Sequence, residues 1–546
     1  MNPRPETMDV DVLIAGYGPT GATLAALLGR RGWRVAVIER APAIYDKPRA
    51  ITADHEALRV FQQIGIAEQV LASAVPHPGT DFVGLQGQVI KRFYPAPPPH
   101  ALGWIPNFMF VQPELEATLR DAIARDRLAR VLLEHELVGY EQSPDRVRAR
   151  LRRVDPGHEG EEIVAHARYL VGADGASSAV RRQMAPAIED LAFDEWWLIV
   201  DAWIQGPVQL PERMRHYCRP SRPGTYIVGP GRLRRWEIKI LPHERPEMFH
   251  DHEAVWRVLG EFVDTSALVH CRTAVYRFHA LVIERWQDGR VFLAGDAAHQ
   301  MPPFMGQGLC AGVRDAFNLA WKLDGVLTRR LPESLLQTYG PERKQHVRTV
   351  VAHTKAFGLI IGELDPDAAR ERDRRLAEEL RSGRAETIRQ RFIPGLETGL
   401  IARGTDGRPA PGAGDLLVQP WVRETDGPWR RLDDVLGAGF AIVARRADDL
   451  AALEEDTIGF CRSIGARIVL VGAQCQTVSL PGAGVLCLEA REPLLDHWFD
   501  ALGASALIAR PDRYVYGAAD GPTGLRALLL GLMARLGDDP RNPGNC

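Results

Sequence analysis

A glycine-rich turn near the start of the chain constrains its fold more than any other feature. Residues 10–15 form a short apolar, β-branched run, which is typical of a buried parallel strand. Three glycines at GxGxxG spacing follow, then a helical run at 22–29 and a second apolar run at 34–38. These glycines are Gly16, Gly18 and Gly21. They allow a tight turn, a close backbone approach to a pyrophosphate and close packing of helix on strand. The segment therefore predicts a strand–turn–helix–strand unit that binds a dinucleotide.

The residues around this turn complete the predicted binding segment. Glu39 follows the second apolar run and is placed to accept hydrogen bonds from ribose hydroxyls. Free N–H groups at the start of the helix would face the phosphates. Pro19 and Thr20 in the turn, and Arg40 beside Glu39, belong to the same segment. A purely structural turn is the alternative, and these residues alone do not distinguish FAD from NAD.

Two later motifs place a glycine beside an aspartate at the end of an apolar strand. Residues 170–181 read LVGADGASSAVR, and residues 290–299 read RVFLAGDAAH. The second motif continues into a proline-containing turn, a GQG sequence and a helix. The cofactor-binding residues predicted in the two motifs are Asp174, Gly175, Gly295, Asp296, Pro303, Gly306, Gln307 and Gly308. Because the three motifs lie far apart in the chain, one nucleotide-binding fold must be assembled from separate segments.

In this order, the three motifs resemble those of the single-component FAD-dependent aromatic hydroxylases, the group of para-hydroxybenzoate hydroxylase. The resemblance covers residues 8 to about 350. It implies that FAD is the bound dinucleotide and that Asp296 binds its ribityl chain. It also implies that Arg49 lies near the flavin pyrophosphate or the nicotinamide nucleotide, and that Gln112 contacts the flavin. A surface arginine and a helix cap are the structural alternatives for these two residues.

Four stretches further resemble the (3-hydroxyphenyl)propionate hydroxylase branch of that family, namely residues 48–62, 110–120, 225–237 and 301–323. This resemblance implies a monooxygenase that converts a phenolic acid to a catechol with NADH or NADPH, O2 and a flavin C4a-hydroperoxide. A polycyclic, polyketide-type phenol is the alternative substrate, because relatives that act on such phenols share much of these stretches. A flavin dehydrogenase or oxidase, and a non-enzymatic flavoprotein, are the remaining alternatives.

Strand-like runs between residues 182 and 275 predict a sheet above the flavin ring that binds the substrate. The candidates for the substrate wall are Tyr226, Trp236, Tyr276 and His279, and those for anchoring an acidic side chain are Arg215, Arg272 and Arg277. Core packing is the alternative for the aromatic residues, and a surface position is the alternative for the arginines. We expect His299 to pack beneath the flavin, and no catalytic residue is assigned.

The expected fold class is α/β, with a Rossmann-like FAD-binding domain interleaved with a β-sheet substrate domain, plus a C-terminal thioredoxin-like domain. The FAD-binding domain is expected in two parts, at 1–181 and, with further helices, at 276–400. The substrate-binding sheet is expected at 182–275, with an additional segment near 80–110 inside the first FAD-binding part. The thioredoxin-like domain is expected at 410–546. A linker rich in proline and glycine at 407–417 precedes the last of these. Cys461, Cys475 and Cys487 form no CxxC pair, so we expect no redox exchange there.

Composition excludes several other classes of protein. The net charge of −3 over 546 residues provides no basic field for nucleic acid. The sequence has no apolar run long enough to span a membrane and no apolar signal-peptide core, so we expect a cytoplasmic protein without a membrane partner. Seven scattered cysteines and the lack of a Cys/His cluster predict neither a disulfide scaffold nor a metal site. The expected partners are a small phenolic substrate and O2, and a homodimer is left open.

Overall fold

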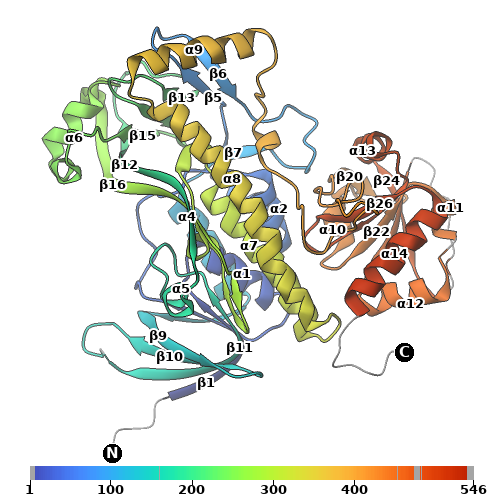
Figure 1. Cartoon of the computed structure of the whole chain (residues 1–546). Coiled ribbons are helices and arrows are strands. Elements are labelled where there is room, and N and C mark those ends of the chain that lie inside the picture. The colour runs from blue at the N-terminus through green and yellow to red at the C-terminus, as the bar shows by residue number, and fades with distance from the viewer. Residues whose placement is uncertain (1–5, 159, 452, 473–479, 481, 538–546) are drawn as a thin grey trace, which may run out of the picture.

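The computed structural model describes residues 6–537 except 159, 452, 473–479 and 481, and its first unit is built on a parallel sheet (Figure 1). Five parallel strands lie side by side in the order β18 (Val291–Leu293), β11 (Glu162–Gly172), β1 (Glu6–Ala15), β2 (Val35–Glu39) and β8 (Arg130–Leu133). Antiparallel strands add to this sheet: β17 (Gln287–Asp288) pairs with β18, and β10 (Val147–Arg153) pairs with β11 and with β9 (His135–Gln142). The apolar run of β1 is buried because neighbouring elements cover both faces of the sheet.

Helices cover this parallel sheet and have clear local causes. The helix α1 (Pro19–Gly29) begins with a proline, which suits the first helical turn, and is buried from Gly21 to Leu28. It contacts α4 (Gln112–Arg125) and α7 (Gly308–Leu327). The helix α2 (His55–Ile64) starts at an Asp54 side-chain cap and ends at Gly65. Smaller elements of this unit are α3 (Ala67–Ala72), α5 (Ala179–Met184) and a sheet of β3 (Thr52–Asp54), β7 (Asn107–Met109) and β4 (Val75–Pro76).

The second unit is an eight-stranded sheet to which distant parts of the chain contribute. Its order is β19 (His299–Gln300), β16 (Leu268–Ile283), β12 (Ile188–Ile204), β15 (Leu233–Lys239), β14 (Gly224–Val228), β13 (Met214–Tyr217), β5 (Thr80–Val83) and β6 (Val89–Phe93). The strand β16 runs past the expected domain end at 275, because it stays paired with β12 as far as Ile283. The helix α6 (His252–Leu259) packs on one face of this sheet. Residues of the opposite face join the core of the first unit.

Two long helices and a C-terminal unit complete the described chain (Figure 1). The helices are α8 (Tyr339–Gly362) and α9 (Pro366–Arg381). The strands of the C-terminal sheet are, in order, β21 (Arg430–Arg431), β20 (Trp421–Arg423), β24 (Val485–Ala490), β23 (Arg467–Val471), β22 (Ala441–Ala444), β25 (Ala506–Ala509) and β26 (Val515–Ala519). Its helices are α10 (Leu432–Leu436), α11 (Ala447–Ala451), α12 (Glu455–Ser463), α13 (Leu494–Leu502) and α14 (Gly521–Gly537). No helix in the described ranges combines the length and the apolar character needed to cross a membrane.

Candidate cofactor and substrate site

The three glycine motifs meet at one edge of the parallel sheet. Strand β1 pairs with β11 up to Ala15 and Gly172, and β11 pairs with β18 up to Gly172 and Leu293. All three strands run in parallel, so their carboxyl ends lie together, and each motif follows one of these ends. Ligands of open α/β sheets bind at this edge. The segments that follow Ala15, Gly172 and Leu293 are far apart in the sequence but thus form one candidate site.

The glycines of the first motif divide into two kinds. Gly16 has a φ of +101°, and a Cβ there would lie 2.3 Å from the Ala173 carbonyl oxygen of the second motif. A Cβ at Gly21 would lie 2.0 Å from the Gly16 carbonyl oxygen. Gly18 is different, because a Cβ there would meet no described atom within 4 Å. Gly16 and Gly21 are therefore required for packing, whereas Gly18 leaves open space beside the backbone, as a pyrophosphate requires.

Neighbouring residues fix the position of this turn. The Glu39 carboxylate accepts hydrogen bonds from the backbone N–H groups of Tyr17 and Ala41, both at 2.9 Å. Thr20 lies under the third motif, since a Cβ at Gly295 would lie 2.7 Å from the Thr20 hydroxyl oxygen. Pro19 starts α1, and Arg40 is exposed. The carboxylate predicted to bind ribose therefore already holds the loop, and each of its oxygens retains further accepting capacity.

The second motif joins the third through an arginine. Ser178 caps α5, and Asp174 Oδ2 accepts from the Ala179 N–H of its first turn at 2.7 Å, while the buried Asp174 Oδ1 has no partner among the described residues. Gly175 has a φ of +78° and open space where a side chain would lie. The Arg181 guanidinium donates to the backbone carbonyl of Asp296 at 3.3 Å and to that of Ala297 at 3.0 Å. An unpaired acceptor and a glycine without close neighbours fit a bound nucleotide at this edge.

The third motif has a buried support beneath it. Asp315 on α7 accepts from the Gly295 N–H at 3.0 Å and from His299 Nε2 at 2.7 Å. The His299 ring stacks on Trp286 at 5.4 Å, which is a packing position. The Asp296 residue retains surface exposure, yet the dense protein around its carboxyl raises its pKa, and nearby His299 and Arg49 act in the opposite direction. This carboxyl is thus available to a ligand while its backbone is fixed.

The turn that follows contributes backbone rather than side chains. Gly306 has a φ of +61°, and a Cβ at Gly308 would meet no described atom within 4 Å. The Gln307 side chain is buried, donating to Asp54 Oδ2 at 3.1 Å and accepting from Arg314 at 3.1 Å. Pro303 opens this turn. The first N–H groups of α7 have no acceptor within the helix, and Gly308 leaves open space beside them, which fits a flavin ring edge.

The loop that carries Arg49 is held from two sides. The Gln112 Oε1 accepts from the Ala50 N–H at 2.6 Å, and its Nε2 donates to Glu116 at 2.7 Å. On the other side, the Arg235 guanidinium donates to the Pro48 carbonyl at 2.8 Å. The Arg49 side chain itself is half exposed and lies 3.8 Å from Glu116. The structure thus gives Gln112 a role in holding this loop and leaves the Arg49 guanidinium accessible.

None of the three arginines predicted to anchor an acidic side chain of the substrate is a free cation that faces the site. Arg272 lies on β16 and is buried, with its guanidinium donating to the Pro48 carbonyl and the Tyr276 hydroxyl and lying 3.5 Å from Asp201. Arg277 pairs with Asp194 at 2.6 Å on the opposite face of the sheet. Arg215 pairs in register with Tyr226, so it also lies on the face that α6 covers. The arginine that the sequence did not single out is Arg235, which binds Asp201 at 2.7 Å.

The candidate substrate wall is corrected in a similar way. Tyr226 and Trp236 are buried under α6 with ring centroids 5.5 Å apart, so they are core residues. His279 lies on the same outer side, 3.7 Å from Asp194. Tyr276 faces the inner side and stacks on Phe278 with an interplanar angle of 12°. Side chains alternate between the two faces of a strand, so one position decides whether a residue points to the inner or the outer face of the sheet. The sequence does not show which residues of these long strands point inward.

An aromatic cluster that the sequence did not single out lies on the inner face. Phe304, from the turn of the third motif, has its ring centroid 5.0 Å from Trp197, 6.3 Å from Phe278 and 6.4 Å from His216. Burial lowers the pKa of His216 to about 3, helped by the positive charge of Arg389, so this ring is neutral. The cluster is itself buried, but unlike Tyr226 and Trp236 it packs against the turn of the third motif, so it is the candidate aromatic wall on the inner face.

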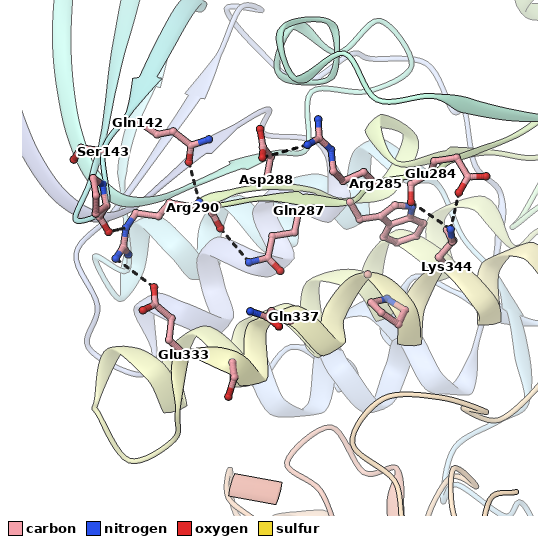
Figure 2. A pocket seen from close by; sticks show the side chains of 16 residues that line it. Gln142, Ser143, Glu284, Arg285, Gln287, Asp288, Arg290, Glu333, Gln337 and Lys344 are labelled. Carbon is pink, nitrogen blue, oxygen red and sulfur yellow. Dashed lines mark hydrogen bonds and ion pairs between the residues drawn. The ribbon is translucent and has the colours of Figure 1, made fainter. Parts of the chain in front are cut away.

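One open cavity lies away from these motifs (Figure 2). It has a volume of about 830 Å³ and is lined by the β9–β10 turn, residues 284–290 and residues 333–344. Its charged side chains pair with one another, as in Arg290 with Glu333 at 3.2 Å and Lys344 with Glu284 at 2.8 Å. It lies at the amino end of β18, whereas the motifs lie at the carboxyl ends of the strands. Over the described residues, no group of His, Cys, Asp and Glu side chains is arranged to hold a metal ion.

Comparisons with known proteins agree with this geometry. Residues 9–354 match the family described as FAD binding domain, and residues 414–530 match the HcaD C-terminal domain. A 3-(3-hydroxy-phenyl)propionate/3-hydroxycinnamic acid hydroxylase 2 of Burkholderia vietnamiensis is 35% identical over 93% of this chain and 93% of its own length.

Two solved structures share the fold. An aklavinone-11 hydroxylase in complex with FAD and aklavinone has a TM-score of 0.74 at 24% identity, covering 96% of this chain and 99% of its own. The flavin-dependent monooxygenase PieE, in complex with FAD and substrate, has a TM-score of 0.76 at 22% identity, covering 97% and 99%. These findings confirm the predicted α/β fold class, whereas the thioredoxin-like assignment of the tail stays a prediction. The chain belongs to the FAD binding domain family, the FAD-dependent aromatic hydroxylases that its three motifs predicted.

Proposed function

We propose that this protein is an FAD-dependent monooxygenase that hydroxylates a phenolic acid beside its existing hydroxyl group and so produces a catechol. NADH or NADPH is the reductant and O2 the oxygen donor. One observation carries the proposal: the three cofactor motifs meet at one sheet edge, and Phe304 of the third motif packs against an aromatic cluster of the eight-stranded sheet. A flavin site beside an aromatic wall suits the oxidation of an aromatic ring.

The substrate class is supported by the full-length relatives. A relative 35% identical over 93% of the chain bears a name that pairs 3-(3-hydroxyphenyl)propionate with 3-hydroxycinnamic acid. The aklavinone hydroxylase shares the fold at 24% identity, which supports the architecture alone. A hydroxyphenylpropionate-like acid is therefore the first substrate of the proposal, and a polycyclic phenol is the second. The carboxylate of the acid has no assigned partner, because Arg215, Arg272 and Arg277 are engaged or lie on the far face.

The residues of the site fit FAD. Gly16, Gly18 and Gly21 would carry the pyrophosphate, Glu39 the ribose, and Asp296 the ribityl chain. When bound, FAD supplies electron transfer from the nicotinamide nucleotide and activation of O2. The protein supplies the rest: it binds and orients the phenol ring, excludes water and controls the phenol proton. Asp315 and Arg181 keep the third motif in place for this purpose.

The remaining parts of the proposal concern the partners. The accessible Arg49 guanidinium, which acts on the charge of Asp296, suits a phosphate of FAD or of a transiently bound nicotinamide nucleotide. A cytoplasmic location agrees with the scattered cysteines.

A panel of phenols tests this function. Purified protein should contain FAD, and 3-(3-hydroxyphenyl)propionate should stimulate NADH or NADPH oxidation with formation of a catechol. Stimulation by a polycyclic phenol but by no simple phenolic acid would replace the first substrate class with the second. Nucleotide oxidation coupled to no hydroxylated product from any phenol would contradict the monooxygenase itself and favour an oxidase.

A further inference from the structure

A buried carboxylate on the inner sheet face has one distant ion pair and accepts no hydrogen bond from the described residues. Glu237 lies in the middle of β15, and only 4% of its surface is exposed. Among the described residues, none donates a hydrogen bond to its carboxylate, and the nearest cation, Arg235, is 4.0 Å away. Buried charges are normally paired and hydrogen-bonded. An exception of this kind calls for a functional explanation.

The register places Glu237 toward the candidate site. Side chains alternate along β15, and Trp236 faces α6, so Glu237 faces the inner side. Glu237 pairs with Ile199 on β12 and with Thr225 on β14, and Thr225 pairs with His216 on β13. His216 Nδ1 lies 2.8 Å from the Thr225 hydroxyl, and the His216 ring contacts Phe304. Glu237 therefore belongs to a polar row beside the aromatic cluster that contacts the third motif.

The neighbouring charges are engaged with other groups. Arg235 on β15 binds Asp201 of β12 at 2.7 Å and donates to the carbonyls of Pro48 and Arg49. Arg272 on β16 also turns to Pro48, so neither guanidinium donates a hydrogen bond to Glu237, and the 4.0 Å ion pair with Arg235 is its closest contact with a cation.

The balance of these groups sets the proton affinity of Glu237. Burial raises the pKa of Glu237 to about 7, with Arg235 and Arg272 opposing the rise and Asp201 adding to it. The neutral His216 contributes no charge from β13. A carboxylate whose pKa lies near neutral pH is suited to accept a proton.

We propose that Glu237 is the base that removes the proton from the phenol hydroxyl of the substrate. The O–H bond of the phenol breaks, its electron pair stays on the phenol oxygen, and the proton binds a carboxylate oxygen of Glu237. The products of this step are a phenolate and a neutral carboxyl group. The inference rests on the proposed function, which requires a phenolic substrate. The step would aid hydroxylation, because a phenolate ring donates electrons to an activated oxygen more readily than a neutral phenol ring.

The test compares the Glu237→Gln holoenzyme with wild type, using 3-(3-hydroxyphenyl)propionate and a ring-fluorinated analogue with a more acidic phenol. Ultraviolet difference spectra of the bound probes report phenolate formation independently of turnover. In wild type the phenolate band should grow as pH rises through about 7. In Glu237→Gln this band should be lost, and kcat should fall about 100-fold with little change in KM. The fluorinated probe should recover at least a tenth of the wild-type rate, because it needs less help from a base.

Matched variants separate catalysis from folding. Glu244→Gln removes a carboxylate that pairs with Arg222 at 2.6 Å, just beyond the end of β15, and should keep kcat within about twofold. Glu237→Asp retains a carboxylate and should restore the phenolate band in part. If Glu237→Gln does not retain FAD, the phenolate band is compared between Glu237→Asp and wild type instead.

The contradicting outcomes are distinct. A phenolate band of wild-type size in Glu237→Gln, or an equal loss of rate with both probes, would overturn the role of Glu237. A band that appears in wild type only at the pKa of the free phenol would do the same. Failure of the wild type to hydroxylate any phenol would instead count against the proposed function.

Discussion

Single glycines of the first motif have separable roles, and this gives a matched pair of variants. Gly16→Ala places a side chain at a φ of +101° and 2.3 Å from the Ala173 carbonyl, so it should reduce the free energy of unfolding by about 2 kcal/mol or more. Gly18→Ala meets no described atom within 4 Å at a φ of −72°, so the FAD-free fold should keep its stability. Its methyl group would instead occupy the space of the pyrophosphate and weaken FAD binding. Urea unfolding and FAD titration separate these effects, and equal FAD affinity in wild type and Gly18→Ala would contradict this site.

The raised pKa of Glu237 should also be detectable without substrate, in the pH dependence of the free energy of unfolding. Its pKa is raised to about 7 in the folded protein, so ionising it there opposes folding as pH rises from its ordinary value toward 7. The difference in the free energy of unfolding between Glu237→Gln and wild type should therefore grow by about 2–3 kcal/mol in favour of the variant as pH rises from about 5 to about 8. Urea unfolding of both proteins at the two pH values measures this difference. A stability difference that does not change with pH would show that Glu237 has an ordinary pKa.

These residues also mark what the sequence can predict. The glycines were found because their spacing follows a strand directly, and spacing is a local property. Glu237 has no such local signal, since its burial and its face depend on which strands flank β15. The same alternation places Trp236 under α6, where the sequence expected a substrate wall. Adjacent residues of one strand point to opposite faces, so Glu237 can face the site while Trp236 belongs to the core.

Among the helices, α7 connects the candidate site to the C-terminal unit through buried charges. Its first turns contact Asp54 and Glu56 through Arg314, and further along Lys322 binds Glu342 of α8 at 2.7 Å. Arg510 of the C-terminal unit binds the same carboxylate at 2.7 Å. These cations hold the pKa of Glu342 well below its usual range. The sequence predicted a helix after the GQG turn, but the partners of its buried ion pairs come from distant segments that the sequence does not bring together.

Removing the shared carboxylate should therefore be costly. Glu342→Gln leaves Lys322 buried without its carboxylate and leaves Arg510 with the Asp512 carboxylate alone, so the free energy of unfolding should fall by about 3 kcal/mol. In wild type, this contribution is present above the ordinary glutamate pKa and is lost as pH falls toward the depressed one. Glu379→Gln on the exposed face of α9 is the control and should change stability by less than about 0.5 kcal/mol. Equal effects of the two substitutions in urea unfolding would show that the network contributes nothing specific.

For the whole molecule, the C-terminal unit is joined to the rest by more than a linker. Arg59 of α2 binds Asp433 at 2.6 Å, and Arg513 lies 3.3 Å from the same carboxylate, all of them buried. The sequence predicted the separate sheet and the linker from composition and strand–helix alternation. It did not predict this interface, because ionic residues carry no sequence signal of which distant partner they meet.

The tail should act through structure and not through thiol chemistry. Burial raises the pKa of Cys461 to about 11, so its thiol stays protonated and unreactive at neutral pH. Cys475 lies outside the described residues. Replacing Cys461, Cys475 and Cys487 with Ser should leave hydroxylation within about twofold of wild type, provided that circular dichroism shows an intact fold. A chain ending near residue 405 should instead lose FAD, since the buried Arg59 would lose Asp433 and the buried Glu342 would lose Arg510. A large loss of turnover in the well-folded Ser variant would contradict this view of the tail.

Oxygen transfer is the most direct test of the whole proposal. The FAD-containing protein, reduced with NADH or NADPH in the presence of 3-(3-hydroxyphenyl)propionate, is mixed with isotopically labelled O2, and the products of one turnover are examined by mass spectrometry. The motifs at the sheet edge and the adjoining aromatic cluster predict a catechol that contains one labelled oxygen atom. Quantitative oxidation of the nucleotide with labelled hydrogen peroxide as the only oxygen product, for this acid and for a polycyclic phenol alike, would contradict it.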